Sequence, residues 1–178
     1  MKNYFSSDYH LCHKNIIKYD KRPFDDIETM NETIIDNHNS VVGKNDNFYF
    51  LGDFCFDNRR TEEFLEQLNG NLFFIKGNHD SRDTIKLYQK YGVYLGEQKK
   101  IKIEDKEIVS NHYAMRVYDK SHRGAWHLYG HSHGSLPDDP NQLSMDVGLM
   151  LHDYKPIDMD YIGKIMAKKT WKPIDHHS

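Results

Sequence analysis

The sequence predicts a fold that mixes α-helices with β-strands in a single domain. Its 178 residues match the size of one compact domain, in which residues from about 170 onward form a C-terminal tail. Up to Gly92, short apolar runs alternate with segments whose apolar residues recur at helical spacing. Beyond Gly92, strand-like segments dominate. The first part therefore predicts strand–helix units around a sheet, and the second part predicts a further group of strands.

The composition is that of a folded protein without a strong overall charge. Hydrophobic residues make up 38% of the chain and aromatic residues 13%, enough apolar surface to offset the chain entropy lost on folding. The formal net charge is −3, which argues against a protein that grips nucleic acid through bulk positive charge. The sequence leaves the oligomeric state open.

The cysteines and the N-terminus indicate the compartment. The two cysteines, Cys12 and Cys55, form no C-x-x-C pattern, so neither a disulfide framework nor a structural zinc site is expected. The first residues lack the apolar stretch of a signal peptide, and no segment has the length of a membrane span. We expect a cytoplasmic protein with reduced thiols and no membrane partner.

In the first half of the chain, three strands are expected at 3–6, 48–51 and 72–75. Each run ends in polar residues: Ser7-Asp8-Tyr9-His10, Gly52-Asp53 and Gly77-Asn78-His79-Asp80. Helices are expected over 25–38, from about Thr61 to the residue before Gly70, and over 81–91 before Gly92, because apolar residues recur there at helical spacing.

In the second half, a hairpin is expected from strands at 101–103 and 107–109, which feed Ser110-Asn111-His112. A strand at 126–129 ends in Gly130-His131-Ser132-His133-Gly134, and another is expected at 143–147. The last amphipathic pattern predicts a helix over 158–169.

Polar residues at strand exits favour ligand binding over packing, because a buried strand rigidly positions the residues that come directly after it. Asp8 and His10 are two residues apart, so in extended backbone their side chains point the same way. Taken alone, that pair is also typical of a turn with a surface histidine, and Asp53 could equally cap a helix. His131 and His133 stand between glycines, where bulky side chains are hard to explain by packing. They favour a ligand role.

Together these motifs resemble the calcineurin-like metallophosphoesterases, in particular their small stand-alone bacterial and phage members. The resemblance spans residues 8–133 and rests on five motifs in one order: Asp8-x-His10, Gly52-Asp53, Gly77-Asn78-His79-Asp80, Asn111-His112 and Gly130-His131-x-His133. It implies a four-layer αββα sandwich of two mixed β-sheets flanked by helices, with the site at the strand exits.

The resemblance also implies a role for each motif residue. One metal ion would be held by Asp8, His10 and His133, and a second ion by Asn78, His112 and His131. Asp53 would bridge the two ions. His79 would serve as the general acid for the leaving oxygen, oriented by Asp80.

Substrate contacts are expected from Arg59, Arg116 and Arg123, although Arg116 and Arg123 are also explained as solvated surface charges. Asp57 and Arg59 are displaced by one residue from the spacing common in the family, which argues against phosphate binding by Arg59.

The donor types fit this assignment on chemical grounds. Carboxylate and amide oxygens mixed with imidazoles, without thiolate, suit two divalent transition-metal ions among Mn²⁺, Fe, Zn²⁺ and Ni²⁺, with manganese favoured. Two such ions facing two carboxylates leave about two surplus positive charges, which suits an anionic ester. Ions about 3.5–4 Å apart can lower the pKa of a shared water toward about 7, so a bridging hydroxide could act as the nucleophile.

The sequence therefore predicts a metallophosphoesterase that hydrolyses a small phosphomonoester or phosphodiester, of which a nucleotide is one example. A nuclease or cyclic-nucleotide phosphodiesterase of the same fold is the alternative, distinguished by basic and aromatic groups beside the metals. A binding scaffold without catalysis is a third alternative. It fits less well, because none of the motif residues is missing.

Overall fold

The computed structural model describes residues 1–175. Its first sheet is built mainly from the N-terminal strand–helix units, with one short strand from the C-terminal part of the chain. Its strands are β1 (Asn3–Ser6), β2 (Asn47–Phe50), β3 (Asn71–Ile75), β4 (Val93–Gly96) and β9 (Ile157–Asp158). They lie in the order β4-β3-β2-β1-β9. The first four are parallel, and β9 runs antiparallel to β1. The carboxyl ends of β1, β2 and β3 therefore lie at the same end of the sheet.

The second sheet comes from the C-terminal part of the chain and is also mixed. Its strands are β5 (Gln98–Ile103), β6 (Lys106–Asn111), β7 (Trp126–Tyr129) and β8 (Ser144–Asp146), in that spatial order. β5 and β6 form an antiparallel hairpin, whereas β6, β7 and β8 are parallel. The parallel strands β6 and β7 deliver His112 and His131 to the same end of this sheet.

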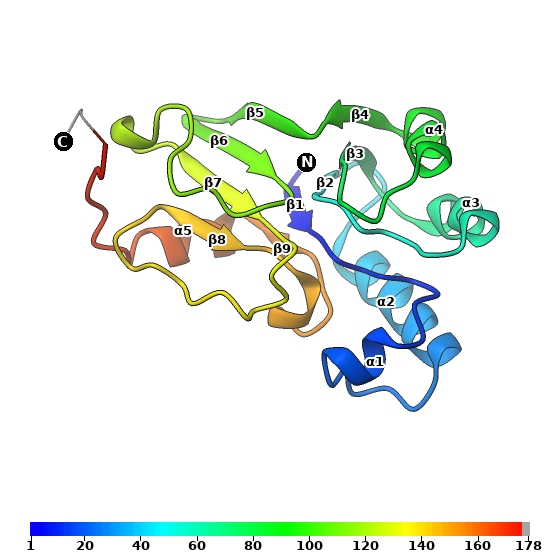
Figure 1. Ribbon diagram of the computed structural model, residues 1–178. Helices are drawn as coiled ribbons and strands as arrows, with labels where there is room; N and C mark the ends of the chain where they lie inside the picture. Colours follow the sequence, from blue (N-terminus) through cyan, green and yellow to red (C-terminus); the bar gives the residue numbers. More distant parts are fainter. Residues whose placement is uncertain (176–178) are drawn as a thin grey trace.

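Most of the helices cover the outer face of the first sheet, and the second sheet lies on its other side (Figure 1). The helices are α1 (Ile16–Tyr19), α2 (Ile27–Val41), α3 (Asn58–Gln67), α4 (Arg82–Tyr91) and α5 (Met159–Met166), with 3-10 turns η1 (Ser121–Arg123) and η2 (Leu149–Leu151). Helix α2 contributes Met30 and Ile34 to a core against Phe48 and Phe50 of β2.

A second core lies between the sheets. Phe5 of β1 and Leu51 pack there with Leu128 of β7, and α5 adds Ile162 and Met166. These side chains are all buried to 3% exposure or less. The first core fixes the helices on the first sheet, and the second core fixes the two sheets against each other, so the ends of the strands are held in a rigid frame.

The predicted αββα sandwich of two mixed sheets flanked by helices is confirmed. All the strands and helices expected from the sequence are present, with shifts at their ends. Helix α3 begins three residues earlier than expected, because Asp57 caps it and its polar first turn carries no apolar period. Helix α5 ends at Met166 rather than Lys169.

The elements that the sequence did not predict are short. They are the four-residue α1 and β4, the two-residue β9 and the two 3-10 turns. Segments of this length contain too few residues to show a period. Within residues 1–175, no helix is both long and apolar enough to span a bilayer. His176 and His177, which the sequence places in the tail, lie outside the described residues.

Candidate metal centre

The seven residues predicted to hold metal come together where the strands of both sheets end. Asp8 and His10 follow β1, Asp53 follows β2, and Asn78 follows β3, while His112 follows β6, and His131 and His133 follow β7. The structure thus unites five loops, in which His10 and His133 lie within 3.0 Å although they are 123 positions apart along the chain.

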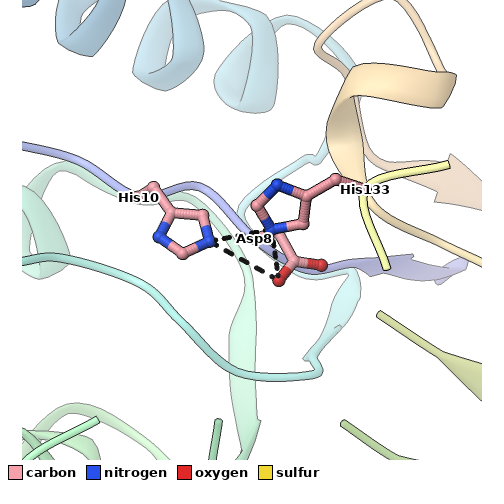
Figure 2. Close-up of side chains that lie close together, drawn as sticks. All are labelled: Asp8, His10 and His133. Carbon is pink, nitrogen blue, oxygen red and sulfur yellow. Dashed lines mark hydrogen bonds and ion pairs between the residues drawn. The ribbon is translucent and has the colours of Figure 1, made fainter. Parts of the chain in front are cut away.

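One carboxylate oxygen of Asp8 faces the site, and the other is hydrogen-bonded to neighbouring groups of the protein. Oδ2 accepts hydrogen bonds from the Ser7 hydroxyl at 2.6 Å and from the backbone N–H of His131 at 3.0 Å. Oδ1 is buried and receives no hydrogen bond. It faces Nε2 of His10 at 3.7 Å and Nε2 of His133 at 3.4 Å (Figure 2). This free, buried oxygen among imidazole nitrogens is what a cation site requires.

Asp53 is divided in the same way. Its Oδ1 accepts a 2.8 Å hydrogen bond from the backbone N–H of His79. Its Oδ2 lies 3.7 Å from Nε2 of His10 and 3.4 Å from Nε2 of His112, so one oxygen faces a residue of each predicted ligand set. The position fits the bridging role expected of Asp53.

The second predicted ligand set converges on the amide oxygen of Asn78. Nε2 of His112 lies 2.9 Å from this oxygen, and Nδ1 of His131 lies 3.0 Å from it. Nδ1 of His112 donates to the carbonyl oxygen of Leu51 at 2.7 Å, so in the neutral ring the lone pair is on Nε2 and points into the cluster. Asn78, His112 and His131 are therefore placed to hold one ion together.

The backbone around the cluster is held in an uncommon conformation. Five of the seven residues have positive φ: Asp8 at 60°, His10 at 50°, Asp53 at 63°, His131 at 66° and His133 at 47°. Non-glycine residues rarely adopt the left-handed region, and they persist there only when their surroundings enforce it. The loops are thus shaped to point side chains into the site at a cost in local strain.

Two glycines allow the loops to approach one another. A Cβ atom on Gly77 would overlap Oδ1 of Asp53, and one on Gly130 would overlap the Ser7 hydroxyl and lie 2.5 Å from Oδ2 of Asp8. Both glycines directly precede predicted ligands, so the absence of a side chain is what brings the loops into range.

The charges within the cluster also fit cations. Burial alone would raise the pKa of Asp8, but the neighbouring imidazoles of His10 and His133 outweigh it and hold the pKa well below its usual value. Burial would lower the pKa of His133, yet Asp20 and Asp8 raise it to about 10. The pKa of Asp53 is lowered by His112 and by the backbone N–H of His79, against the effect of burial. The two carboxylates thus stay charged and attract positive charge, either as protons or as metal ions.

Asp80 uses both of its carboxylate oxygens for contacts with groups other than the His79 ring. Oδ2 accepts from the backbone N–H groups of Gly77 and Asp53, and Oδ1 accepts from the N–H of Phe54 and the hydroxyl of Tyr88. Both oxygens are occupied by these donors, and within residues 1–175 no interaction joins the carboxylate to the His79 imidazole. Asp80 is a buried brace for the loop that carries Asp53, and the expected contact with His79 is not formed.

His79 itself lies at the rim of the cluster. Its exposed ring is 5.8 Å from the ring of His10 and 4.8 Å from the ring of Phe56, measured between centroids. It is close enough to reach a group bound by the cluster, and its backbone N–H fixes Asp53.

The three arginines expected to contact substrate are not gathered at the cluster. The Arg59 side chain is 91% exposed and pairs with Asp57 at the start of α3. Arg123 precedes β7, at the end of the strand opposite His131. Arg116 lines an open cavity of about 470 Å³, together with Tyr129 and Ser144 on the second sheet.

Two residues of the site gave no signal in the sequence. Asp20 accepts a 2.7 Å hydrogen bond from Nδ1 of His133, and Arg22 donates to the backbone carbonyl oxygens of Asp8 and Tyr9. Both lie in the loop after the first motif, where no periodicity or motif spacing marks them.

Comparison with solved structures identifies the fold. The structure resembles the protein of unknown function AQ665 from Aquifex aeolicus with a TM-score of 0.70 and 23% identity, over 92% of this chain and 98% of that one. It also resembles a protein described as a novel archaeal phosphodiesterase, with a TM-score of 0.52 and 16% identity over 89% and 99%. The chain has the metallophosphoesterase fold.

Sequence relatives define the family. The uncharacterized protein MJ1445 of Methanocaldococcus jannaschii is 36% identical over 175 residues, which cover 94% of this chain and 92% of that protein. The gene 66 protein of Mycobacterium phage L5 is 31% identical over 97 residues, or 49% of this chain and 46% of its own length. No family model matches the sequence. The chain belongs to one family with MJ1445.

Proposed function

We propose that this protein is a metal-dependent phosphoesterase that hydrolyses a phosphomonoester or phosphodiester at a dinuclear centre. One observation supports the proposal above the others. Asp8 and Asp53 each tie one carboxylate oxygen to backbone N–H groups or to a hydroxyl, and each points the other oxygen at imidazole nitrogens. Both residues are 2% exposed or less. A buried carboxylate with one oxygen facing imidazole nitrogens is suited to bind a cation, and stabilisation of the fold alone does not explain it.

The residues divide into two ligand sets that share Asp53. Asp8, His10 and His133 would hold one ion. Asn78, His112 and His131 would hold the other, and Oδ2 of Asp53 faces both sets. When bound, a pair of divalent cations supplies positive charge for the phosphate oxygens and acidifies water enough for it to act as the nucleophile. The protein then needs no side-chain nucleophile of its own.

His79 is the proposed general acid. Its exposed imidazole lies beside the cluster, from where a ring nitrogen could give a proton to the oxygen of the departing alcohol. Its backbone N–H meanwhile holds Asp53, so the metal shell and the proton donor are supported by the same turn.

The donor set narrows the choice of metal. Nitrogen and hard oxygen donors without thiolate favour Mn²⁺, Fe, Zn²⁺ or Ni²⁺ over Ca²⁺ and Mg²⁺, which prefer oxygen alone. We propose manganese as the first ion to test.

The proposal is tested by metal analysis of the purified protein, followed by assays with each metal restored to chelated protein. The panel contains p-nitrophenyl phosphate, bis-p-nitrophenyl phosphate, nucleoside monophosphates and 2′,3′- and 3′,5′-cyclic nucleotides. Hydrolysis that requires metal, at about two ions per chain, would support the proposal. Folded, metal-loaded protein that cleaves no ester would instead indicate a binding scaffold.

A nucleotide-containing diester is the second candidate, because exposed aromatic side chains flank the cluster. Phe56 is 41% exposed and lies beside His79, and Tyr113 is 48% exposed with its ring 4.5 Å from that of His131. Lys76 lines the same cavity as Tyr113, so a cationic and a stacking group lie together there. If Phe56→Ala and Tyr113→Ala weakened cleavage of nucleotide esters but not of p-nitrophenyl phosphate, this candidate would be favoured.

A further inference from the structure

Asp20 connects two loops of the cluster that are far apart in the sequence. It lies just after helix α1, in the segment that links the first motif to α2, and its side chain is 11% exposed. Its Oδ2 accepts a 2.7 Å hydrogen bond from Nδ1 of His133, which is 113 positions away. A carboxylate can only accept, so Nδ1 of His133 carries the proton.

The proton on Nδ1 decides what the other ring nitrogen can do. With Nδ1 protonated, the neutral ring of His133 has its lone pair on Nε2, which faces Oδ1 of Asp8 at 3.4 Å and Nε2 of His10 at 3.0 Å. Figure 2 shows the rings of His10 and His133 turned toward the same oxygen of Asp8. The contact with Asp20 therefore points the lone pair of His133 Nε2 at the place where an ion would be bound.

Arg22 holds Asp20 in this position. Its Nε and one terminal nitrogen donate to the same Oδ2 of Asp20 at 3.2 Å each. The terminal nitrogens also donate to the carbonyl oxygens of Tyr9 at 2.9 Å and Asp8 at 3.0 Å. The Arg22 side chain is fully buried, so its charge depends on Asp20 and on these carbonyls for partners.

We propose that Asp20 is a positioning residue, which fixes His133 in the Nδ1–H form and orients its Nε2 toward Asp8 to complete the first metal site. Arg22 supports it by locking Asp20 to the backbone of Asp8 and Tyr9. The inference rests on the proposed function only in taking Asp8, His10 and His133 as the ligands of a divalent ion.

The first test measures metal binding without any turnover. Mn²⁺ and Zn²⁺ are titrated calorimetrically into chelated wild-type protein, Asp20→Asn and Asp20→Ala. We expect Asp20→Ala to weaken the affinity for one of the two ions about 10- to 100-fold and to leave the other within about twofold. Asp20→Asn, whose amide oxygen can still accept from Nδ1, should lose less. Unchanged affinity for both ions in a folded Asp20→Ala variant would overturn the proposal.

Asp158→Asn is the matched control. Asp158 is also an acidic side chain in a hydrogen-bonding role, but it caps α5 and pairs with Lys2. Because asparagine still caps a helix, the variant should keep the affinity for both ions. If Asp158→Asn weakened metal binding as much as Asp20→Ala, the effect would be a general response to the loss of an acidic side chain, and the positioning role would be refuted.

A spectroscopic readout keeps the proposal testable if the Asp20 variants fail to fold. Long-range ¹H–¹⁵N correlation spectra of wild-type protein with and without Zn²⁺ report which nitrogen of His133 carries the proton. We expect Nδ1–H with Zn²⁺ bound, and Nε2–H would overturn the proposal.

The two proposals can fail separately. If metal binding follows the prediction but no ester is cleaved, the proposed function fails alone. If esters are cleaved and Asp20→Ala binds both metal ions normally, this inference fails alone.

Discussion

The hydroxyl of Tyr88 donates a 2.9 Å hydrogen bond to Oδ1 of Asp80, and both residues are buried. Tyr88 belongs to α4, whereas Asp80 ends the turn that carries Asn78 and His79. Since Asp80 also accepts from the N–H groups of Gly77 and Asp53, the bond ties helix α4 to two loops of the candidate metal centre. Helix packing and site geometry are therefore coupled through one carboxylate.

Replacing Tyr88 with Phe should lower the free energy of unfolding by about 1–2 kcal/mol, because a buried carboxylate would lose one of its donors. The ring would still stack on Phe74, whose centroid lies 4.1 Å away at an interplanar angle of 1°, so no cavity is created. Urea unfolding monitored by circular dichroism measures the change. The control is Tyr161→Phe at a partly exposed hydroxyl, and an equal loss in both variants would contradict the prediction.

His38 should make the stability of the protein depend on pH. Burial lowers its pKa to about 4, against the opposing effect of the hydrogen bond between its Nε2 and the carbonyl oxygen of Asn69. Nδ1 of the ring lies 3.0 Å from the Tyr9 hydroxyl. The unfolded chain takes up this proton at about 6.5, so the stabilisation is complete above pH 6.5 and is lost as the pH falls toward 4.

The corresponding experiment compares wild-type protein with His38→Gln in chelator at pH 7.5 and pH 5. The difference in unfolding free energy between them should shrink by about 2 kcal/mol at the lower pH, because glutamine does not titrate. Urea unfolding at each pH gives this difference. Parallel pH profiles for the two proteins would show that His38 is not responsible.

Asp53→Ala should abolish the binding of at least one metal ion. The substitution removes the oxygen that faces both His10 and His112, and also the acceptor of the His79 N–H. Metal content after dialysis against Mn²⁺ measures the effect. Asp57→Ala is the control from the same loop, because Asp57 caps α3: it should lose about 1 kcal/mol of stability and keep both ions. Retention of both ions at normal affinity by Asp53→Ala would refute the bridging assignment.

The strand exits could be predicted from the sequence because each motif comes after an apolar run whose type can be recognised. Phe48-Tyr49-Phe50-Leu51 before Gly52-Asp53 is one example, where β2 ends at Phe50, within one residue of the expected end. The sequence placed the histidine and aspartate residues beyond each run at the ends of the strands, although it left open a turn at Asp8 and His10 and a helix cap at Asp53. Parallel strands bring these side chains to the same end of each sheet, and the resemblance to a known family predicted that they would converge in one cluster.

The supporting residues could not be predicted, because their roles depend on how loops cross in space. Asp20 lies 12 residues beyond Asp8 in a segment without a period, and its partner His133 comes from the other sheet. Asp80 was expected to orient His79, its neighbour in sequence. Its side chain turns instead to backbone N–H groups of the Asp53 loop and to Tyr88, contacts that sequence proximity does not reveal.

His79→Ala should keep both metal ions and lose most of the turnover on an ester with a poor leaving group. Its imidazole is at the rim of the cluster and is not among the predicted ligands, whereas its backbone N–H, which holds Asp53, is retained in alanine. A positioned acid contributes roughly 10²- to 10⁴-fold in rate, so kcat should fall by that amount on an alkyl phosphate and far less on p-nitrophenyl esters. Steady-state kinetics on both ester types, with metal content measured in parallel, provides the check.

His13→Ala serves as the control, because His13 also packs on Phe56, with ring centroids 4.1 Å apart, but lies outside the motifs. Equal losses in the two variants would attribute the effect to packing around Phe56, and an unchanged rate on the alkyl phosphate would remove His79 from the mechanism.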